Sequence, residues 1–191
     1  PYGADLPIAM QVQQSFERSL EHLRTNYHDA FLLHGPHSQF GLVDEDWEAW
    51  GELEALRESG KVKHLGICNV SIQQLTELYE EVDAKPTFVQ NRCFASTEWD
   101  GEVREFCRES GIVYQGFSLL TANPEVFEAP NVIEICQQMK CTPAQVVFAF
   151  ARQIGMIALT GTTSSAHMKQ DLDSLKIELS SAQLAVIEEV L

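Results

Sequence analysis

The sequence is poor in basic residues and has no long hydrophobic run. Of its 191 residues only 13 are Lys or Arg, against 28 Asp or Glu, which gives a formal charge of −15. A chain of this charge repels phosphate backbones and anionic lipids, so neither nucleic acid nor a membrane surface is expected as a partner. No segment approaches the roughly 20 apolar residues of a membrane-spanning helix, and we expect a soluble protein.

Cysteines are few, and their spacing fits neither a disulfide framework nor a zinc site. No Cys-x-x-Cys pair occurs, and the odd number argues against paired bridges. Apolar neighbours surround them, which is typical of buried thiols in a reducing compartment, and we expect the cytoplasm. The five are Cys68, Cys93, Cys107, Cys136 and Cys141.

Apolar segments of strand length alternate with amphipathic helical segments, which predicts an α/β fold with parallel strands. The first strand is expected to be buried on both faces, because it is a continuous apolar run ended by Gly35 and Pro36. The five predicted strands are 30–34, 62–69, 88–93, 112–118 and 156–162. The predicted helices are 9–25, 47–59, 100–110, 132–140 and others that begin near 71, 142, 164 and 180, the last running to 191.

Several helix ends carry recognisable signals. Ser71 with Gln74 forms a capping box, as do the segments that begin at Thr142 and Ser180. Gly60 and Gly111 stand where a C-terminal glycine cap is expected. These signals fix the helix ends independently of the apolar pattern.

Two architectures contain parallel strands of this kind, an open doubly wound sheet and a (β/α)₈ barrel. No G-x-G-x-x-G or G-x-x-x-x-G-K-[ST] motif follows any strand, which argues against the open sheet. A closed barrel needs about 250 residues, so about three β/α units are missing. The chain also opens with Pro1 rather than Met. We therefore expect a single domain over residues 1–191, an N-terminally truncated (β/α)₈ barrel whose exposed edges offer surfaces for pairing.

Polar side chains stand where the predicted strands end, which is the edge that carries the chemistry of barrels. Carboxamides, an imidazole, an aromatic ring and a helix N-terminus suit an uncharged hydrogen-bonding ligand with an anionic tail, as in a nucleotide cofactor. Taken singly, each has a structural explanation as a loop cap or core residue. The residues are His34, Cys68, Asn69, Gln90, Asn91, Phe117, Ser118, Gly161, Thr162 and Thr163.

Six segments in chain order resemble successive blocks of the aldo-keto reductases: YHDAFLLHGP, GKVKHLGICNVSIQQL, KPTFVQNRCF, TPAQVVF, LTGTTSSAHMKQDL and ELSSAQLAVIEEV. The resemblance covers essentially the whole chain. It implies a (β/α)₈ oxidoreductase that transfers a hydride between NADP(H), or alternatively NAD(H), and a small-molecule carbonyl or alcohol without a metal.

The resemblance also implies roles for individual residues. His34 matches the histidine that orients the carbonyl oxygen. Asn69 and Gln90 match the residues that hold the nicotinamide carboxamide, together with the position of Cys68, and Phe117 matches the aromatic that stacks beneath the ring. Ser118 and Leu120 match the loop along the pyrophosphate. The adenosine end matches Gly161, Thr162, Ser164, His167, Gln170 and Asp171.

The chain departs from the family pattern at several positions. Cys68 replaces a usual Ser, which is a better hydrogen-bonding partner. Gly161 and His167 stand where NADP-preferring members often carry Lys and Arg, and Leu119 replaces a customary Pro. Preference for NADP over NAD therefore stays open.

The family's general-acid tyrosine, its lysine and its aspartate belong to the first three β/α units, which are absent. General acid catalysis contributes on the order of 10²–10⁴-fold, so we expect this chain alone to turn over negligibly. Two other hypotheses stay open. In one, the chain is a non-catalytic cofactor-binding or scaffold subunit. In the other, it is a barrel hydrolase that uses His34 and His37 as metal ligands.

Overall fold

Helices and strands alternate along the chain as expected from the sequence. The computed structural model describes residue 3 and residues 5–190, and within those residues nine α-helices and five β-strands follow one another. The chain divides into two compact units, Pro1–Gln90 and Asn91–Leu191. None of the described helices is both long and apolar enough to span a bilayer.

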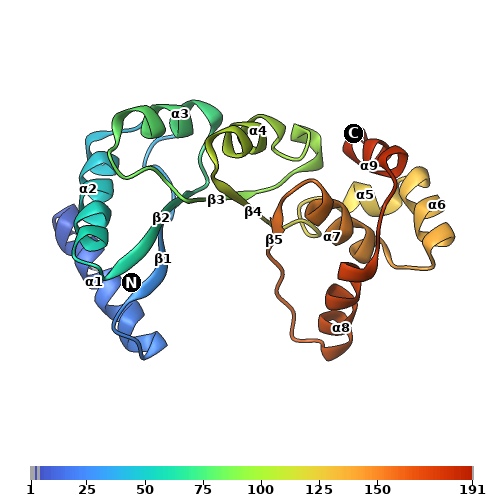
Figure 1. Ribbon diagram of the computed structural model, residues 1–191, viewed down its shortest axis with the longest axis horizontal. Coiled ribbons are helices and arrows are strands. Elements are labelled where there is room, and N and C mark those ends of the chain that lie inside the picture. The colour runs from blue at the N-terminus through green and yellow to red at the C-terminus, as the bar shows by residue number, and fades with distance from the viewer. Residues whose placement is uncertain (1–2, 4, 191) are drawn as a thin grey trace. The chain divides into compact units, whose positions relative to one another are not determined.

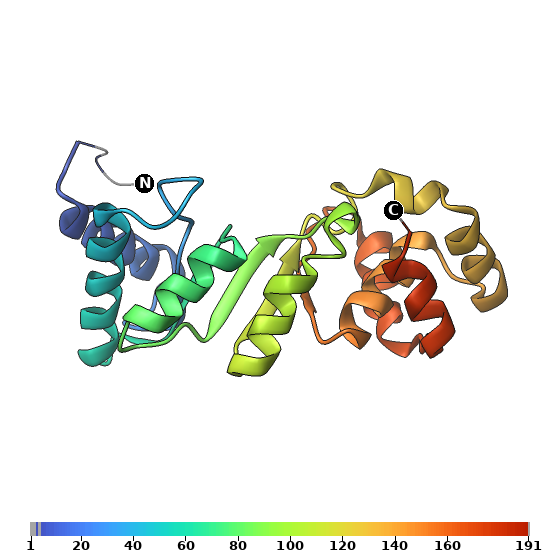
Figure 2. The same ribbon diagram turned by 90° about the horizontal axis from the view of Figure 1, so that it is seen from above.

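The first unit consists of parallel strands with helices packed against them (Figures 1 and 2). β1 pairs with β2 in parallel, with Phe31 opposite Leu65, and β2 pairs with β3 in parallel, with Ile67 opposite Val89. Helix α1 packs on α2, and the rings of Phe16 and Phe31 meet edge-on with centroids 5.7 Å apart. Its elements are α1 (Ile8–Leu23), β1 (His28–Leu33), α2 (Asp44–Glu58), β2 (Val62–Cys68), α3 (Ile72–Glu81) and the start of β3 (Phe88–Arg92).

The second unit packs its helices around α7 (Pro143–Gln153), which lies against α6, α8 and β5 (Figure 1). Residues 146–151 of α7 are all buried, as expected of a helix that is apolar on every side. β4 pairs with β5 in parallel, with Gln115 opposite Ile157. The other elements are η1 (Ala95–Thr97), α4 (Gly101–Ser110), β4 (Val113–Phe117), α5 (Pro124–Glu128), α6 (Pro130–Met139), β5 (Ile157–Ala158), α8 (Ser165–Asp173), η2 (Ser174–Lys176) and α9 (Ser181–Glu188).

The helix-end signals read from the sequence are confirmed. The Ser71 hydroxyl accepts a hydrogen bond from the Gln74 backbone at 3.3 Å, and Gln74 Oε1 accepts one from the Ser71 backbone at 3.1 Å. The same reciprocal pair occurs at Thr142 with Gln145 and at Ser180 with Gln183. Gly60 and Gly111 have φ of +75° and +70°, the left-handed conformation of a glycine that ends a helix.

The prediction that the first strand is buried on both faces is wrong. β1 begins at His28, and Phe31, Leu32 and Leu33 are only half-buried. Among the described residues β1 pairs with β2 alone, so one edge of the strand has no neighbouring strand to cover it. A continuous apolar run thus does not distinguish a central strand from a strand at an edge.

The last predicted strand, 156–162, is reduced to the two residues of β5. The Leu159 backbone still donates to the Gly116 carbonyl at 2.8 Å. Beyond that point β4 offers no further partners, because Ser118 turns away with φ +58°. The length of β5 is therefore set by its neighbour.

Two helices also differ from the prediction. The sequence predicts no helix over α5, because its five residues are too few to show a helical period, although Pro124 stands at its first position, where proline is favoured. The closing helix ends at Glu188 rather than at 191. Leu191 lies outside the described residues.

Candidate cofactor and substrate site

The ends of β1, β2 and β3 bring three predicted site residues together within the first unit. The Asn69 side chain donates from Nδ2 to the His34 carbonyl at 2.8 Å, and its backbone N–H donates to the Gln90 carbonyl at 3.0 Å. Asn69 has φ +53°, a left-handed conformation that asparagine tolerates better than most residues. This bend carries the chain away from β2 and links the ends of three successive strands.

Cys68 lies beside these residues at the end of β2, opposite Gln90 in the sheet register. Its side chain is 7% exposed, and burial raises the pKa of the thiol to about 11. The thiol is therefore protonated near neutral pH and is a weak hydrogen-bonding group. It is unsuited to nucleophilic or metal chemistry.

A second histidine of the same loop has a defined partner. His37 Nδ1 lies 2.7 Å from Asp46 Oδ1, and Asp46 is only 2% exposed. His34 and His37 both line a cavity of about 250 Å³. No group of three or more potential metal-ligating side chains occurs in the part of the chain that the structure describes.

In the second unit, a cavity of about 350 Å³ lies at the carboxyl ends of β4 and β5. It is lined by four of the predicted cofactor-binding residues, namely Phe117, Ser118, Leu120 and Gly161. The Arg92 guanidinium lies over the Phe117 ring, 5.7 Å from its centroid. The cavity thus combines an aromatic face with the loop that follows β4.

The other predicted residues of the second unit surround the start of α8. Ser164 Oγ accepts from the His167 backbone at 3.3 Å, and Thr162 Oγ1 accepts from the Ser164 backbone at 3.1 Å. Asp171 accepts from the Thr160 hydroxyl at 3.0 Å, and the Gln170 carbonyl accepts from the Gln145 side chain at 3.1 Å. Ser164 is the N-cap of α8, and Thr162 binds the turn just before it. Of these residues only Thr160 lines the 350 Å³ cavity.

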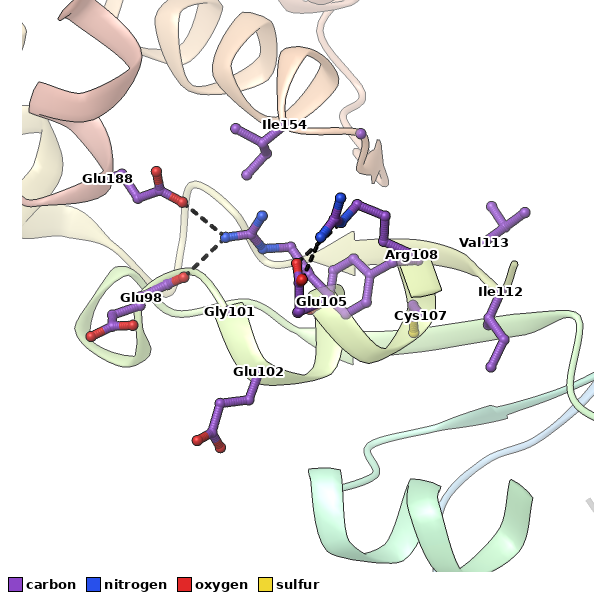
Figure 3. Close-up of a pocket in the computed structure, with 13 residues that line it drawn as sticks. Glu98, Gly101, Glu102, Glu105, Cys107, Arg108, Ile112, Val113, Ile154 and Glu188 are labelled. Carbon is purple, nitrogen blue, oxygen red and sulfur yellow. Dashed lines mark hydrogen bonds and ion pairs between the residues drawn. The ribbon is translucent and has the colours of Figure 1, made fainter. Parts of the chain in front are cut away.

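A further cavity of about 650 Å³ lies at the amino end of β4, beside α4 (Figure 3). Both of its arginines are paired: Arg108 binds Glu105, and Arg104 binds Glu188 at 3.2 Å. No sequence motif marks this cavity, because its lining comes from separate elements. Chemistry in parallel α/β folds concentrates at the carboxyl ends of strands, so the smaller 350 Å³ cavity is the better candidate.

A left-handed turn borders this larger cavity. Glu98, Trp99 and Asp100 have φ of 53°, 56° and 61° in succession. Arg104 donates to the carbonyls of Trp99 at 2.7 Å and Glu98 at 3.2 Å, and Trp99 Nε1 donates to the Ile187 carbonyl at 3.1 Å. A left-handed residue costs roughly 1–2 kcal/mol, which these hydrogen bonds offset.

The chain is similar to proteins of one family over almost its whole length. The family model described as "Aldo/keto reductase family" matches residues 8–191. Aldo-keto reductase family 4 member C11 of Arabidopsis thaliana is 28% identical over 180 residues, covering 86% of this chain and 57% of that protein. Glyoxal reductase of Bacillus subtilis is 26% identical over 174 residues, covering 91% of this chain and 60% of that protein. The chain thus spans about six tenths of the length of these curated relatives.

Solved structures show the same fold. The crystal structure of an aldo/keto reductase from Brucella melitensis matches with a TM-score of 0.84 at 24% identity, covering 95% of this chain and 68% of that one. MGS-M4, an aldo-keto reductase from a Medee basin deep-sea metagenome library, matches with a TM-score of 0.85 at 19% identity, covering 94% and 65%. The predicted fold class is confirmed: parallel strands with intervening helices, as part of a (β/α)₈ barrel.

Proposed function

Because the chain belongs to the aldo/keto reductase family, we propose that it serves the reduction of aldehydes or ketones to alcohols by hydride transfer from NADPH or NADH. The observation that carries this proposal is the junction at Asn69. There one side chain ties the end of β1 to the end of β2, and its backbone N–H binds the end of β3. Three of the expected site residues are thereby held in a fixed relation.

The polar groups at this junction fit a nicotinamide carboxamide. Asn69 uses Nδ2 to bind the His34 carbonyl, so its Oδ1 stays available as an acceptor for the carboxamide NH₂. Gln90 lies beside it and offers a second amide. We assign these two residues to the carboxamide, with Cys68 at its edge, and His34 to the carbonyl oxygen of the substrate.

The 350 Å³ cavity of the second unit fits the stacking face and the pyrophosphate path of a dinucleotide. Phe117 offers the ring face for stacking, and Ser118 and Leu120 border the path of the pyrophosphate. Thr162, Ser164, His167, Gln170 and Asp171 are assigned with Gly161 to the adenosine end, where the N-terminus of α8 favours negative charge. That all these side chains face one dinucleotide stays a prediction.

The charges near α8 bear on the choice between the two nucleotides. We propose NADP(H) from the family membership and NAD(H) as the second candidate. Gly161 and His167 stand where NADP-preferring members often carry a Lys and an Arg that bind the 2′-phosphate. The absence of both charges narrows the difference in affinity between the two nucleotides.

The residues of this chain bind and orient, and none of them is assigned the general-acid role. We therefore propose that the 191-residue chain alone reduces carbonyls negligibly, since general acid catalysis supplies on the order of 10²–10⁴-fold. Consumption of NADPH with an aldehyde at ordinary enzyme rates would contradict this proposal. Nucleotide binding without turnover would favour a cofactor-binding subunit.

Titration of NADPH and NADH against tryptophan fluorescence tests the proposal, because a bound reduced nicotinamide absorbs where tryptophan emits and quenches nearby indoles; Trp50 and Trp99 are both buried. We expect saturable quenching. Asn69→Gly keeps the left-handed backbone and removes the amide, so it should weaken binding about five- to tenfold, the value of one hydrogen bond. Asn131→Ala, an exposed asparagine on α6, is the matched control. The absence of quenching by either nucleotide would overturn the proposed function.

A further inference from the structure

The loop that follows β1 holds a histidine whose ring orientation is fixed by a buried carboxylate. Asp46 is the third residue of α2 and is 2% exposed. Its oxygens accept the backbone N–H groups of His37 at 2.9 Å and Val43 at 3.0 Å, and the His37 ring nitrogen Nδ1 lies 2.7 Å away. Asp46 thus caps the helix and orients the imidazole at the same time.

This contact determines which ring nitrogen carries the proton in neutral His37. An ionised carboxylate only accepts hydrogen bonds, so Nδ1 must be the donor. Nε2 is then left with a lone pair, and no described residue binds it. The His37 side chain is 50% exposed, so this acceptor is available to a ligand.

The position of His37 places this acceptor next to the assigned carbonyl-orienting residue. Only Gly35 and Pro36 separate it from His34, and both histidines line the cavity of about 250 Å³. Most of the lining is apolar, including Val12, Phe31 and Leu53. A site of this size suits a molecule of a few carbon atoms that has one oxygen for each imidazole.

We propose that His37, positioned by Asp46, is a specificity-determining residue that accepts a hydrogen bond from a hydroxyl group of the substrate, so that the substrates are hydroxy-aldehydes or hydroxy-ketones. This inference rests on the proposed function, since it names the substrate class of that site. It assigns recognition to His37 and ring positioning to Asp46. Neither residue is assigned a bond-making step.

Nitrogen NMR of the histidine-labelled full chain tests the inference without any turnover. In the neutral form of the ring, the His37 signals should show a protonated Nδ1 and an unprotonated Nε2. Addition of hydroxyacetone should shift the Nε2 signal saturably, because that nitrogen accepts the hydroxyl hydrogen bond. Acetone, which has the carbonyl but no hydroxyl, should leave it in place.

Two variants separate recognition from a purely structural role. Asp46→Asn keeps a single acceptor oxygen where the carboxylate binds two backbone N–H groups and the ring, so it loosens the orientation of His37 and should weaken the hydroxyacetone shift. His37→Phe should weaken hydroxyacetone binding about five- to tenfold, the value of one hydrogen bond. His22→Phe, an exposed histidine of α1, is the matched control.

An Nε2 signal that is unmoved by hydroxyacetone in the unaltered chain would overturn the inference, as would equal shifts with acetone. These readouts do not depend on nucleotide. A chain that binds NADPH but ignores hydroxyacetone refutes the role of His37 alone. A chain that binds no nucleotide refutes the proposed function whatever the histidine signals show.

Discussion

Cys68 is the residue at which a single atom separates this chain from the family pattern. The thiol is 7% exposed and protonated near neutral pH, since burial raises its pKa to about 11. Cys68→Ser restores a hydroxyl that donates and accepts next to the assigned carboxamide position. We expect nucleotide affinity to rise about fivefold, the value of one neutral hydrogen bond, as measured by tryptophan quenching.

Cys107→Ser controls for the general effect of placing a hydroxyl in the core. Cys107 is 1% exposed on α4 and has no assigned role. The Cys107→Ser variant should be less stable than the unaltered chain and should bind nucleotide with unchanged affinity. If Cys68→Ser binds no more tightly than the unaltered chain, the thiol does not lie at the carboxamide.

For single residues, the sequence indicates which of them stand at strand ends, but not the backbone conformation and hydrogen bonds that fix their positions. Asn69 is visible as a polar residue after an apolar run. Its left-handed backbone depends on the register of three strands, which no local pattern reveals. The sequence does not predict the pairing of His37 with Asp46, because the two residues are nine positions apart across an irregular loop and a helix start, and no motif marks the contact.

Among the elements, the close spacing of β1, β2 and β3 depends on Gly66. A Cβ atom there would lie 2.6 Å from the Phe88 carbonyl oxygen and 2.8 Å from Leu32 Cγ. Backbone cannot move aside as a flexible side chain can. Gly66→Ala should therefore lower the free energy of unfolding by about 1–3 kcal/mol or more, as measured by urea denaturation.

Gly51→Ala is the matched comparison for this substitution. Gly51 lies on the exposed side of α2, and a Cβ there meets nothing within 4 Å. Alanine in a helix interior is favoured over glycine by roughly 0.5–1 kcal/mol, so this variant should be stabilised. Loss of stability of equal size in both variants would mean that the strand spacing is not tight.

The apolar pattern predicts elements well where their own residues determine them. All five strands and the capped helices appear, because side-chain alternation and caps are local properties. The length of β5 depends on its partner β4, which ends at the bend of Ser118. Helix α5 has too few residues to show a period.

On the scale of the whole molecule, buried cysteine thiols and a buried tyrosine hydroxyl predict that the fold loses stability at alkaline pH. Burial raises the pKa of Cys93 and Cys107 to about 12 and that of Cys68 and Cys136 to about 11, from a usual 9.0. It also raises the pKa of Tyr114 strongly. The folded chain therefore holds more protons than the unfolded chain above about pH 9.

The sign of the effect follows from this difference in bound protons. The stabilisation is complete below pH 9 and is lost as pH rises toward 12, so the free energy of unfolding should fall across that range in urea titrations. Cys93→Ala removes one of these groups and should decline less steeply with pH, although it is less stable at pH 8. A pH-independent stability between 8 and 11 would refute the prediction.

The candidate cofactor and substrate site is the part of the molecule that the sequence predicts least completely. Resemblance supplies the expected residues, and each unit brings some of them together: His34, Asn69 and Gln90 in the first, and Phe117, Ser118, Leu120 and Gly161 in the second. Ser164 caps α8 and Thr162 binds the turn before it, in line with the structural explanation of this segment as an N-cap turn. Whether a residue binds ligand or backbone depends on partners that the local sequence does not specify.

The left-handed turn at Trp99 also constrains the order in which this chain matures as it leaves the ribosome. The indole and Arg104 both depend on acceptors in α9, and the Trp99 bond joins residues 88 positions apart. Those acceptors are still untranslated when the turn itself emerges. Helix α9 is synthesised after this turn and supplies the acceptors that hold it, so a nascent chain that stalls or is cleaved before α9 would leave the turn without these hydrogen bonds.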